Sequence, residues 1–312
     1  MLRDTLKGTG VALVTPFKKD QSIDFAALEN LIEIQIKGGI DYIVTLGTTG
    51  ESVTLTEKEK VEVFNFTVEK VNGRVPIVIG IGGNNTASVI EAFGKFDLTK
   101  VVAILSVTPY YNKPTQEGLF QHYTALANVA PKPIILYNVP GRTGRNMTAA
   151  TSLRLAAHPN IAGIKEAGPE MAQTIDLLKD RPKDFLVVSG DDEIVMAQIA
   201  CGMDGVISVA ANAFPKPFSD MIRYCMAGDF SMAKRLNDLM VEGYTYMYEE
   251  NNPSGIKAFL FEQGLIENEF RLPLVPVSAG LQKKIHDYLQ KYFYSSGYRP
   301  TEYPSGEYRS NM

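Results

Sequence analysis

The sequence of 312 residues contains no tryptophan, only two cysteines and only three histidines. Two cysteines are too few for a disulfide framework, and a chain of this length buries enough surface to fold without disulfides or a structural metal. Cys201 and Cys225 both lie in apolar, helix-like stretches, so we expect two buried structural thiols in a protein of a reducing compartment. The histidines are far apart in the sequence, which argues against a metal site built on them.

A strong charge of one sign is also absent. The formal net charge is −4, from 31 Lys+Arg and 35 Asp+Glu, and there is no block of basic residues. Nucleic acid is therefore not an expected partner. No window approaches the ~20 apolar residues of a membrane span, and the N-terminal stretch lacks the apolar core of a signal peptide. We expect a cytoplasmic protein with no membrane partner.

Short apolar runs rich in β-branched residues recur up to Gly228, and segments with helical spacing separate them. The predicted strands are 11–15, 42–46, 76–80, 101–106, 133–137, 161–165, 185–189 and 205–209. The predicted helices are 24–37, 56–71, 86–93, 115–130, 148–157, 169–178, 191–201 and 215–227. This alternation predicts an α/β fold with a parallel sheet, most economically a closed (β/α)8 TIM barrel.

An open, doubly wound sheet is the rival architecture. It commonly carries a G-x-G-x-x-G turn after its first strand, and no such turn is present here. The nearest glycine-rich turn, 80–84, follows the third predicted strand and is typical of a tight turn rather than of a phosphate site. The barrel is therefore favoured.

The strand pattern stops after Gly228. Residues 229–250, 254–263 and 278–293 have helical patterns, which predicts a C-terminal helical appendage. The stretch from Tyr294 is rich in Ser, Gly, Pro and Tyr, and is predicted to be a loose tail or an arm on another subunit. We thus expect a catalytic barrel at 1–228, a helical domain at 229–296 and a flexible tail at 297–312.

The sixth predicted strand ends in Lys165-Glu166 and is followed by Gly168-Pro169. A lysine at the end of a buried strand lies in a medium of low dielectric, which favours the neutral and nucleophilic amine. The competing interpretation is an ordinary lysine that reaches into solvent and pairs with Glu166. The residues at the ends of the other strands favour the first interpretation.

In a (β/α)8 barrel, the loops after the strands meet at one mouth and build the active site. Here these loops carry polar and reactive groups, whereas the opposite strand ends carry mostly Pro, Gly and ordinary charges. An amine can form an imine with a ketone, and the protonated imine lets a proton leave the adjacent carbon to give an enamine. Hydroxyl groups can move the protons, and a guanidinium can bind a carboxylate in a bidentate manner. The candidates for these roles are Tyr137, Thr48, Thr49, Tyr111 and Arg142.

Each candidate also has a structural alternative. Tyr137 and Tyr111 could be packing residues, Thr48 and Thr49 could cap the turn into the next helix, and Arg142 could form a surface salt bridge. Only their convergence on one mouth distinguishes a site from these separate roles.

Four motifs carry a resemblance to a known family. They are G-T-T-G-E-S at 47–52, T-P-Y-Y-N-K-P-T-Q-E-G at 108–118, Y-N-V-P-G-R-T-G at 137–144 and G-I-K-E-A at 163–167. In their order and spacing they resemble the dihydrodipicolinate synthase family, which belongs with N-acetylneuraminate lyase to the class I pyruvate aldolases. The resemblance extends from about Gly8 to about Leu289.

The resemblance implies a lyase that needs no cofactor and no metal, and that condenses pyruvate with L-aspartate 4-semialdehyde to 4-hydroxy-tetrahydrodipicolinate in lysine biosynthesis. It also implies a homotetramer built as a dimer of dimers. The implied roles are Schiff-base lysine for Lys165, proton transfer for Tyr137, Thr48 and Tyr111, pyruvate binding for Thr49 and the Ile207 backbone, and aldehyde carboxylate binding for Arg142. Tyr111 is implied to reach into the site of a neighbouring subunit.

Two other functions stay open at this stage. A related pyruvate aldolase could act on a sugar acid or a hydroxy-oxo acid. The lyase branch of the superfamily typically has Gly-Ser-Thr-Gly-Glu in place of the Gly-Thr-Thr-Gly-Glu found here, and it lacks an arginine in the loop after Y-N-x-P. Thr48 and Arg142 therefore favour the synthase. A non-catalytic barrel that binds an oxo acid is disfavoured, because none of Lys165, Tyr137 and Thr48 is lost.

Overall fold

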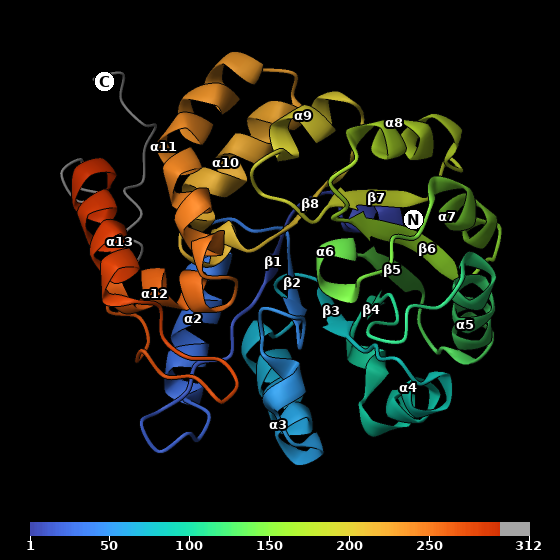
Figure 1. The fold of residues 1–312 in the computed structure, drawn as a ribbon, viewed down its shortest axis with the longest axis horizontal. Helices are drawn as coiled ribbons and strands as arrows, with labels where there is room; N and C mark the ends of the chain where they lie inside the picture. Colours follow the sequence, from blue (N-terminus) through green and yellow to red (C-terminus); the bar gives the residue numbers. More distant parts are fainter. Residues whose placement is uncertain (294–312) are drawn as a thin grey trace.

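The computed structural model describes residues 1–293, and the tail predicted from Tyr294 lies outside this range. Eight parallel strands close into a barrel in the order β1 to β8, and β8 pairs back with β1 (Figure 1). The strands are β1 Gly8–Ala12, β2 Tyr42–Thr45, β3 Ile77–Gly80, β4 Ala103–Val107, β5 Ile134–Asn138, β6 Ile161–Glu166, β7 Leu186–Ser189 and β8 Gly205–Ser208. The predicted TIM barrel is confirmed.

Helices follow the strands and form the outer layer of the barrel (Figure 1). They are α2 Phe25–Lys37, α3 Glu57–Val71, α4 Thr86–Ala92, α5 Gln116–Val129, α7 Ala149–Ala156, α8 Met171–Asp180, α9 Val195–Ala200 and α10 Pro215–Met226. Their first turns begin where the sequence offers caps: Asp24 accepts a bond from Ala27 N, and Thr56 and Glu59 form the predicted capping box.

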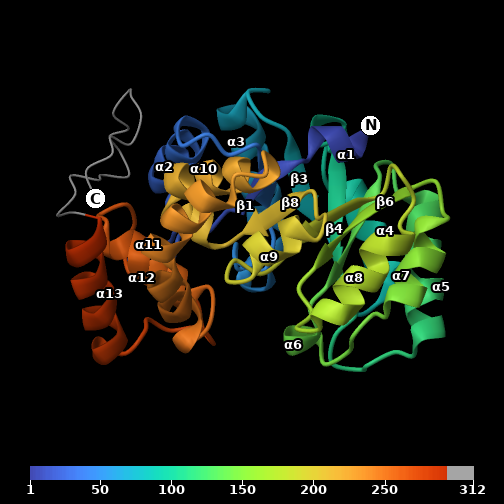
Figure 2. The same cartoon turned by 90° about the horizontal axis from the view of Figure 1, so that it is seen from above.

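Three further helices, α11 Phe230–Glu249, α12 Ser254–Glu262 and α13 Ala279–Tyr292, gather at one side of the barrel (Figures 1 and 2). Helix α11 packs on α10, and α12 and α13 pack on α11. Buried Phe214, which follows β8, stacks on Phe293 and meets Phe259 of α12 edge-to-face. The segment between α11 and α12 is thereby brought to the mouth of the barrel.

The core has two layers, because strand side chains alternate between the two faces of the sheet. One cluster fills the barrel and includes Tyr42, Leu105, Ile135 and Val188. The larger cluster lies between the strands and the helices. Within residues 1–293, no helix combines the length and the apolar character needed to cross a membrane.

The first strand was predicted at 11–15 but lies at Gly8–Ala12. The prediction followed the apolar run, whereas the pairing of two strands depends on how closely their backbones can approach each other. A Cβ at Gly10 would lie 2.2 Å from Cε2 of Tyr42 on the neighbouring strand, so glycine is required there. Two short helices, α1 Leu2–Thr5 and α6 Pro140–Thr143, were not predicted.

Helix α9 was predicted from residue 191 but begins at Val195. Buried Asp192 accepts bonds from the N–H groups of Val209 and Ala210, which holds this stretch as a loop against the chain after β8. The prediction that both cysteines are buried is right for Cys225 and wrong for Cys201. Helix α9 ends at Ala200, so Cys201 occupies its exposed C-cap.

Candidate active site

Lys165 and Tyr137 lie side by side on neighbouring strands. They are register partners in the pairing of β6 with β5. Both side chains are buried, with Lys165 only 4 % exposed, and the Lys165 Nζ lies 4.5 Å from the centroid of the Tyr137 ring. Glu166 bonds to Asn138 and Gly168 rather than to the lysine. The structure therefore does not have the solvent-exposed Lys165–Glu166 pair that was the competing interpretation.

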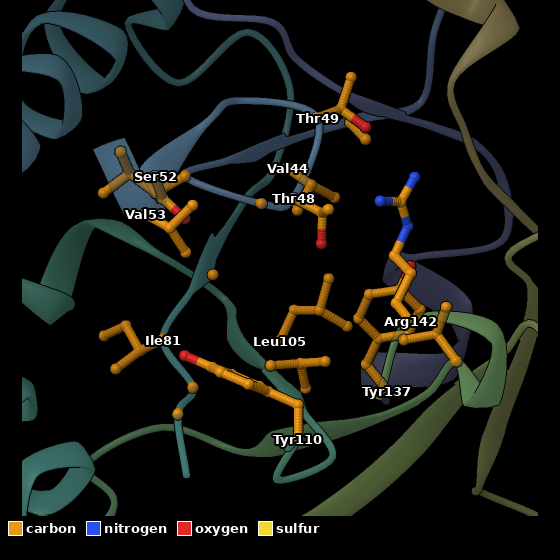
Figure 3. A pocket seen from close by; sticks show the side chains of 18 of the residues that line it. Val44, Thr48, Thr49, Ser52, Val53, Ile81, Leu105, Tyr110, Tyr137 and Arg142 are labelled. Atoms are coloured by element: carbon orange, nitrogen blue, oxygen red, sulfur yellow. The ribbon is translucent and has the colours of Figure 1, made fainter. Parts of the chain in front are cut away.

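These two residues line a cavity of about 1130 Å³ at the mouth of the barrel. Thr48, Thr49 and Arg142 line the same cavity, so five of the candidate residues meet there. Figure 3 shows the two threonines on the loop after β2, with the Arg142 side chain extending toward them and Tyr137 beneath it. The convergence expected from the strand ends is present in the structure for these residues.

The loop after β2 is held from the C-terminal helices. Asn252 Nδ2 donates a bond of 3.1 Å to Thr49 Oγ1. Two residues further on, Glu51 forms a fully buried ion pair with Lys257 of α12, at 2.7 Å. Glu51 has φ +52°, a left-handed conformation that non-glycine residues seldom adopt, so this loop has a defined and unusual path. The threonines are thus placed by contacts more than 200 residues away in the sequence.

Arg142 lies in α6, which follows β5. Its Nη2 donates to Asn251 Oδ1 at 3.2 Å and to the Asn252 carbonyl at 3.0 Å. The remaining guanidinium donors face an open region, since the side chain is exposed at the cavity mouth. This arrangement suits an anion that enters from solvent.

Two candidate residues do not line the cavity. Tyr111 is 88 % exposed and has φ +71°, while its neighbour Tyr110 lines the cavity. Ile207 is buried in β8 as part of the cluster inside the barrel, and it is Val209, two residues further on, that lines the cavity. One chain alone therefore leaves Tyr111 outside the site.

Three contributors to the site were missed by the sequence reasoning. Asn251 and Asn252 join the site from the turn between α11 and α12, and the Asn-Asn-Pro sequence marks only a turn. Gly190 follows β7, and a Cβ there would lie 2.8 Å from Cε of Lys165. Any side chain at this position would press against the lysine. The signal that could have identified Gly190 is its position directly after a predicted strand.

Two buried carboxyl groups lie next to the site. Burial raises the pKa of Glu166 to about 7, against the opposing effect of bonds from Gly168, Asn138 and Gln173. Burial likewise raises the pKa of Asp192 to about 6, against bonds from the backbone of Ala210 and the side chain of Ser208. Both carboxyl groups accept hydrogen bonds from the loops around the lysine, and neither lines the cavity.

A buried amine against a phenol, with hydroxyl groups above it and a guanidinium at the mouth, can capture a small keto acid as an imine. The phenol and hydroxyls can move protons to and from the carbon next to the imine. The guanidinium can hold the carboxylate of a second substrate over the resulting enamine. The geometry therefore suits carbon–carbon bond formation between two small acids.

Comparison with known proteins agrees with this chemistry. Residues 5–292 match the model of the dihydrodipicolinate synthetase family. The 4-hydroxy-tetrahydrodipicolinate synthase of Parabacteroides distasonis is 48 % identical over 287 residues, which cover 92 % of this chain and 97 % of the relative. That of Cytophaga hutchinsonii is 49 % identical over 281 residues, covering 90 % and 95 %.

Solved structures give the same result. Dihydrodipicolinate synthase from Aquifex aeolicus superimposes with a TM-score of 0.89 at 38 % identity, covering 92 % of this chain and 98 % of that one. The chloride-inhibited enzyme from Acinetobacter baumannii, solved in complex with pyruvate, has a TM-score of 0.89 at 41 % identity, with coverage of 92 % and 98 %. The motifs, the barrel and the family match agree, and the chain belongs to the dihydrodipicolinate synthetase family.

Proposed function

We propose that this enzyme is a lyase that condenses pyruvate with L-aspartate 4-semialdehyde to 4-hydroxy-tetrahydrodipicolinate, in the diaminopimelate route to lysine. The observation that carries the proposal is the buried Lys165 amine against Tyr137, in a cavity that Arg142 borders. The names of the curated relatives support the same reaction. The free thiols of Cys201 and Cys225 support a cytoplasmic location.

The reaction begins when the Lys165 amine attacks C2 of pyruvate and water leaves to give a protonated imine. The imine withdraws electrons, so C3 loses a proton and an enamine forms. The enamine carbon attacks the aldehyde carbon of the second substrate and makes the new carbon–carbon bond. The amino group of that substrate then displaces the lysine from the imine carbon, which closes the ring and frees Lys165.

The other residues have supporting roles in this scheme. Tyr137 and Thr48, together with Tyr111, move protons at each step. The Thr49 hydroxyl and the Ile207 backbone bind the pyruvate carboxylate. Arg142 binds the carboxylate of the aldehyde substrate at the cavity mouth. In support of these roles, Thr48, Thr49 and Arg142 border the same cavity as the lysine.

Tyr111 takes part only if a second copy of the chain supplies it, because it is exposed and lies outside the cavity of its own chain. The proposed assembly is a homotetramer of two dimers, in which each Tyr111 enters the site of its partner. Exposed Val53 lies in the loop after β2 at the edge of the same cavity, which gives such a contact an apolar surface.

Mixing two inactive variants is expected to restore activity if the site is shared. Tyr111→Phe and Lys165→Ala should each be severely impaired alone. After subunit exchange, random pairing should give intact sites at about a quarter of the wild-type number, since each mixed dimer has one site with both native residues. Tyr137→Phe mixed with Lys165→Ala is the matched control and should stay inactive. No regain in the first mixture would contradict a shared site.

Replacing Arg142 with alanine should mainly weaken the aldehyde substrate. A charge-assisted hydrogen bond contributes about 1.5–3 kcal/mol, so the KM for L-aspartate 4-semialdehyde should rise about 10- to 100-fold. The KM for pyruvate should change little. Arg145→Ala is the control, because Arg145 lies three residues away and bonds to the Lys113 carbonyl instead. Steady-state kinetics with each substrate varied in turn measures the difference, and an equal rise for both substrates would count against the assignment.

A screen of aldehydes tests the proposed reaction as a whole. The enzyme is incubated with pyruvate and one aldehyde at a time, and the cyclic product is measured with L-aspartate 4-semialdehyde. Sugar aldehydes such as N-acetylmannosamine and simple hydroxy-aldehydes serve as the competing class. Turnover that is faster with a sugar aldehyde than with the semialdehyde would replace the synthase by a related aldolase.

A further inference from the structure

Two polar side chains lie directly behind the lysine and the tyrosine. Asn138 follows Tyr137 in β5, Glu166 follows Lys165 in β6, and the two are register partners. Because successive strand side chains point to opposite faces, Lys165 and Tyr137 point into the barrel while Asn138 and Glu166 point toward the helices. Both polar side chains are buried. The proposed mechanism gives neither of them a role.

Glu166 holds the segments that follow both reactive residues. Asn138 Nδ2 donates to Glu166 Oε1 at 2.9 Å and to Oε2 at 3.1 Å. The backbone N–H of Gly168 donates to Oε1 at 2.6 Å, and Gln173 Nε2 of α8 lies 3.4 Å from Oε2. One carboxylate thereby joins the end of β5 to the turn that leaves β6.

Asn138 extends this connection to the segment beyond Arg142. Its Oδ1 accepts a bond from Met147 N at 2.9 Å, and its Nδ2 also lies 2.8 Å from Asn146 Oδ1. Asn146 and Met147 follow α6, the short helix that carries Arg142. The Asn138–Glu166 pair therefore lies where the strand of the lysine, the strand of the tyrosine and the loop of the arginine meet.

The chemistry of the pair requires an acceptor at position 166. In the described part of the chain, every group that bonds to the Glu166 carboxylate is an N–H donor, and none is a cation. A carboxylate accepts at both oxygens, whereas a glutamine would turn an NH2 group toward one of these donors. Burial without a cation also opposes ionisation and raises the pKa of Glu166 to about 7. An apolar side chain would avoid the cost of burying a carboxyl group, but it would leave the N–H groups of Asn138 and Gly168 without this acceptor.

We propose that Glu166, through Asn138, is a positioning residue that fixes the Lys165 amine against Tyr137 for imine formation. The inference rests on the proposed function, because it concerns the same amine. Small displacements are enough to matter: a misplacement of about 1 Å can lower a rate about 100-fold. Loss of the pair should therefore slow imine formation more than it weakens the binding of either substrate.

The test is the rate at which pyruvate forms an imine on Lys165, measured by borohydride trapping in the absence of the second substrate. Glu166→Gln should lower this rate at least about 10-fold, with little change in the KM for L-aspartate 4-semialdehyde. Glu166→Asp, which keeps an acceptor-only group, should recover part of the rate. Gln173→Ala is the matched control, since Gln173 lies on neither strand and its loss keeps the Asn138–Glu166 bonds. It removes the longest contact to Glu166 and the Gln173 bonds to Asn146 and Met147. Circular dichroism and the unfolding midpoint of each variant confirm that it is folded.

The outcomes separate this inference from the proposed function. If wild-type Lys165 is not trapped at all, the proposed function fails. If it is trapped and Glu166→Gln is trapped equally fast, or Gln173→Ala is slowed as much as Glu166→Gln, the positioning role is wrong. Should Glu166→Gln not fold, Asn138→Ala removes the same contact from the other strand and must slow the trapping for the inference to stand.

Discussion

Lys165→Ala is expected to abolish turnover, with a loss on the order of 10⁴- to 10⁶-fold, the range found when a covalent nucleophile is removed. The reason is that this amine makes the covalent bond to pyruvate in the proposed scheme, and every later step depends on that bond. The amine is buried in the barrel mouth against Tyr137, so a water molecule or a distant lysine would not replace it. Consumption of pyruvate and of the semialdehyde, measured separately, gives the result.

Two control variants give the reason for the loss. Lys165→Arg keeps a positive charge but cannot supply a free amine, because arginine stays protonated, so it should be as inactive as the alanine variant. Lys95→Ala removes another lysine that borders the same cavity and should keep most of the activity, since Lys95 pairs with Glu57, the first residue of α3. Activity of Lys165→Ala above a tenth of the wild-type value would show that this amine is not the nucleophile.

Lys257→Met is expected to lower the free energy of unfolding by about 3–5 kcal/mol, because removal of one partner leaves the other charge buried without compensation. Lys257 Nζ donates to Glu51 Oε1 and to the Glu269 carbonyl, each at 2.7 Å. It also lies 4.5 Å and 4.3 Å from the ring centroids of Phe17 and Phe270. The methionine side chain fills the space but removes the ammonium group that pairs with Glu51. Urea unfolding at neutral pH measures the change.

The same variant should also lose activity, since Glu51 follows Thr48 and Thr49 in one loop. Lys283→Met is the matched control: Lys283 pairs with Asp287 on the exposed face of α13, and its loss should cost no more than about 1 kcal/mol. The double variant Glu51→Gln/Lys257→Met should recover part of the stability, because no buried charge remains. A loss below about 1 kcal/mol for Lys257→Met would mean that the pair does not hold this loop.

The fold followed from the sequence where periodicity and caps agree. Strands β2 to β8 and the capping box of α3 are confirmed. Apolar runs and capping residues favour strands and helix starts through interactions within the segment itself, so they can be recognised in the sequence. The first strand was misplaced, since its pairing depends on glycines that carry no hydrophobic signal. Helix α6 was missed because four residues are too few to show a helical period.

The candidate site was predictable where it depends on barrel topology. Lys165 and Tyr137 were expected to meet, since they end consecutive strands, and they are register partners. The Asn252–Thr49 bond was not predictable, because it depends on how the C-terminal helices pack and no local pattern encodes that packing. Strand alternation explains why Glu166 points away from Lys165 and bonds to Asn138 and Gly168, but the sequence analysis had left a Lys165–Glu166 pair open. The place of Tyr111 in the site stays a prediction, because Tyr111 is exposed and lies outside the cavity of its own chain.

The most direct test of the central claim is reduction with borohydride in the presence of pyruvate, followed by peptide mass mapping. The account predicts one pyruvate-derived adduct, on the peptide that contains Lys165, and none when Lys165 is alanine. It also predicts no adduct on the wild-type Lys165 when borohydride is added after pyruvate has been removed. An adduct on another lysine, or no adduct under conditions where the enzyme turns over, would contradict it.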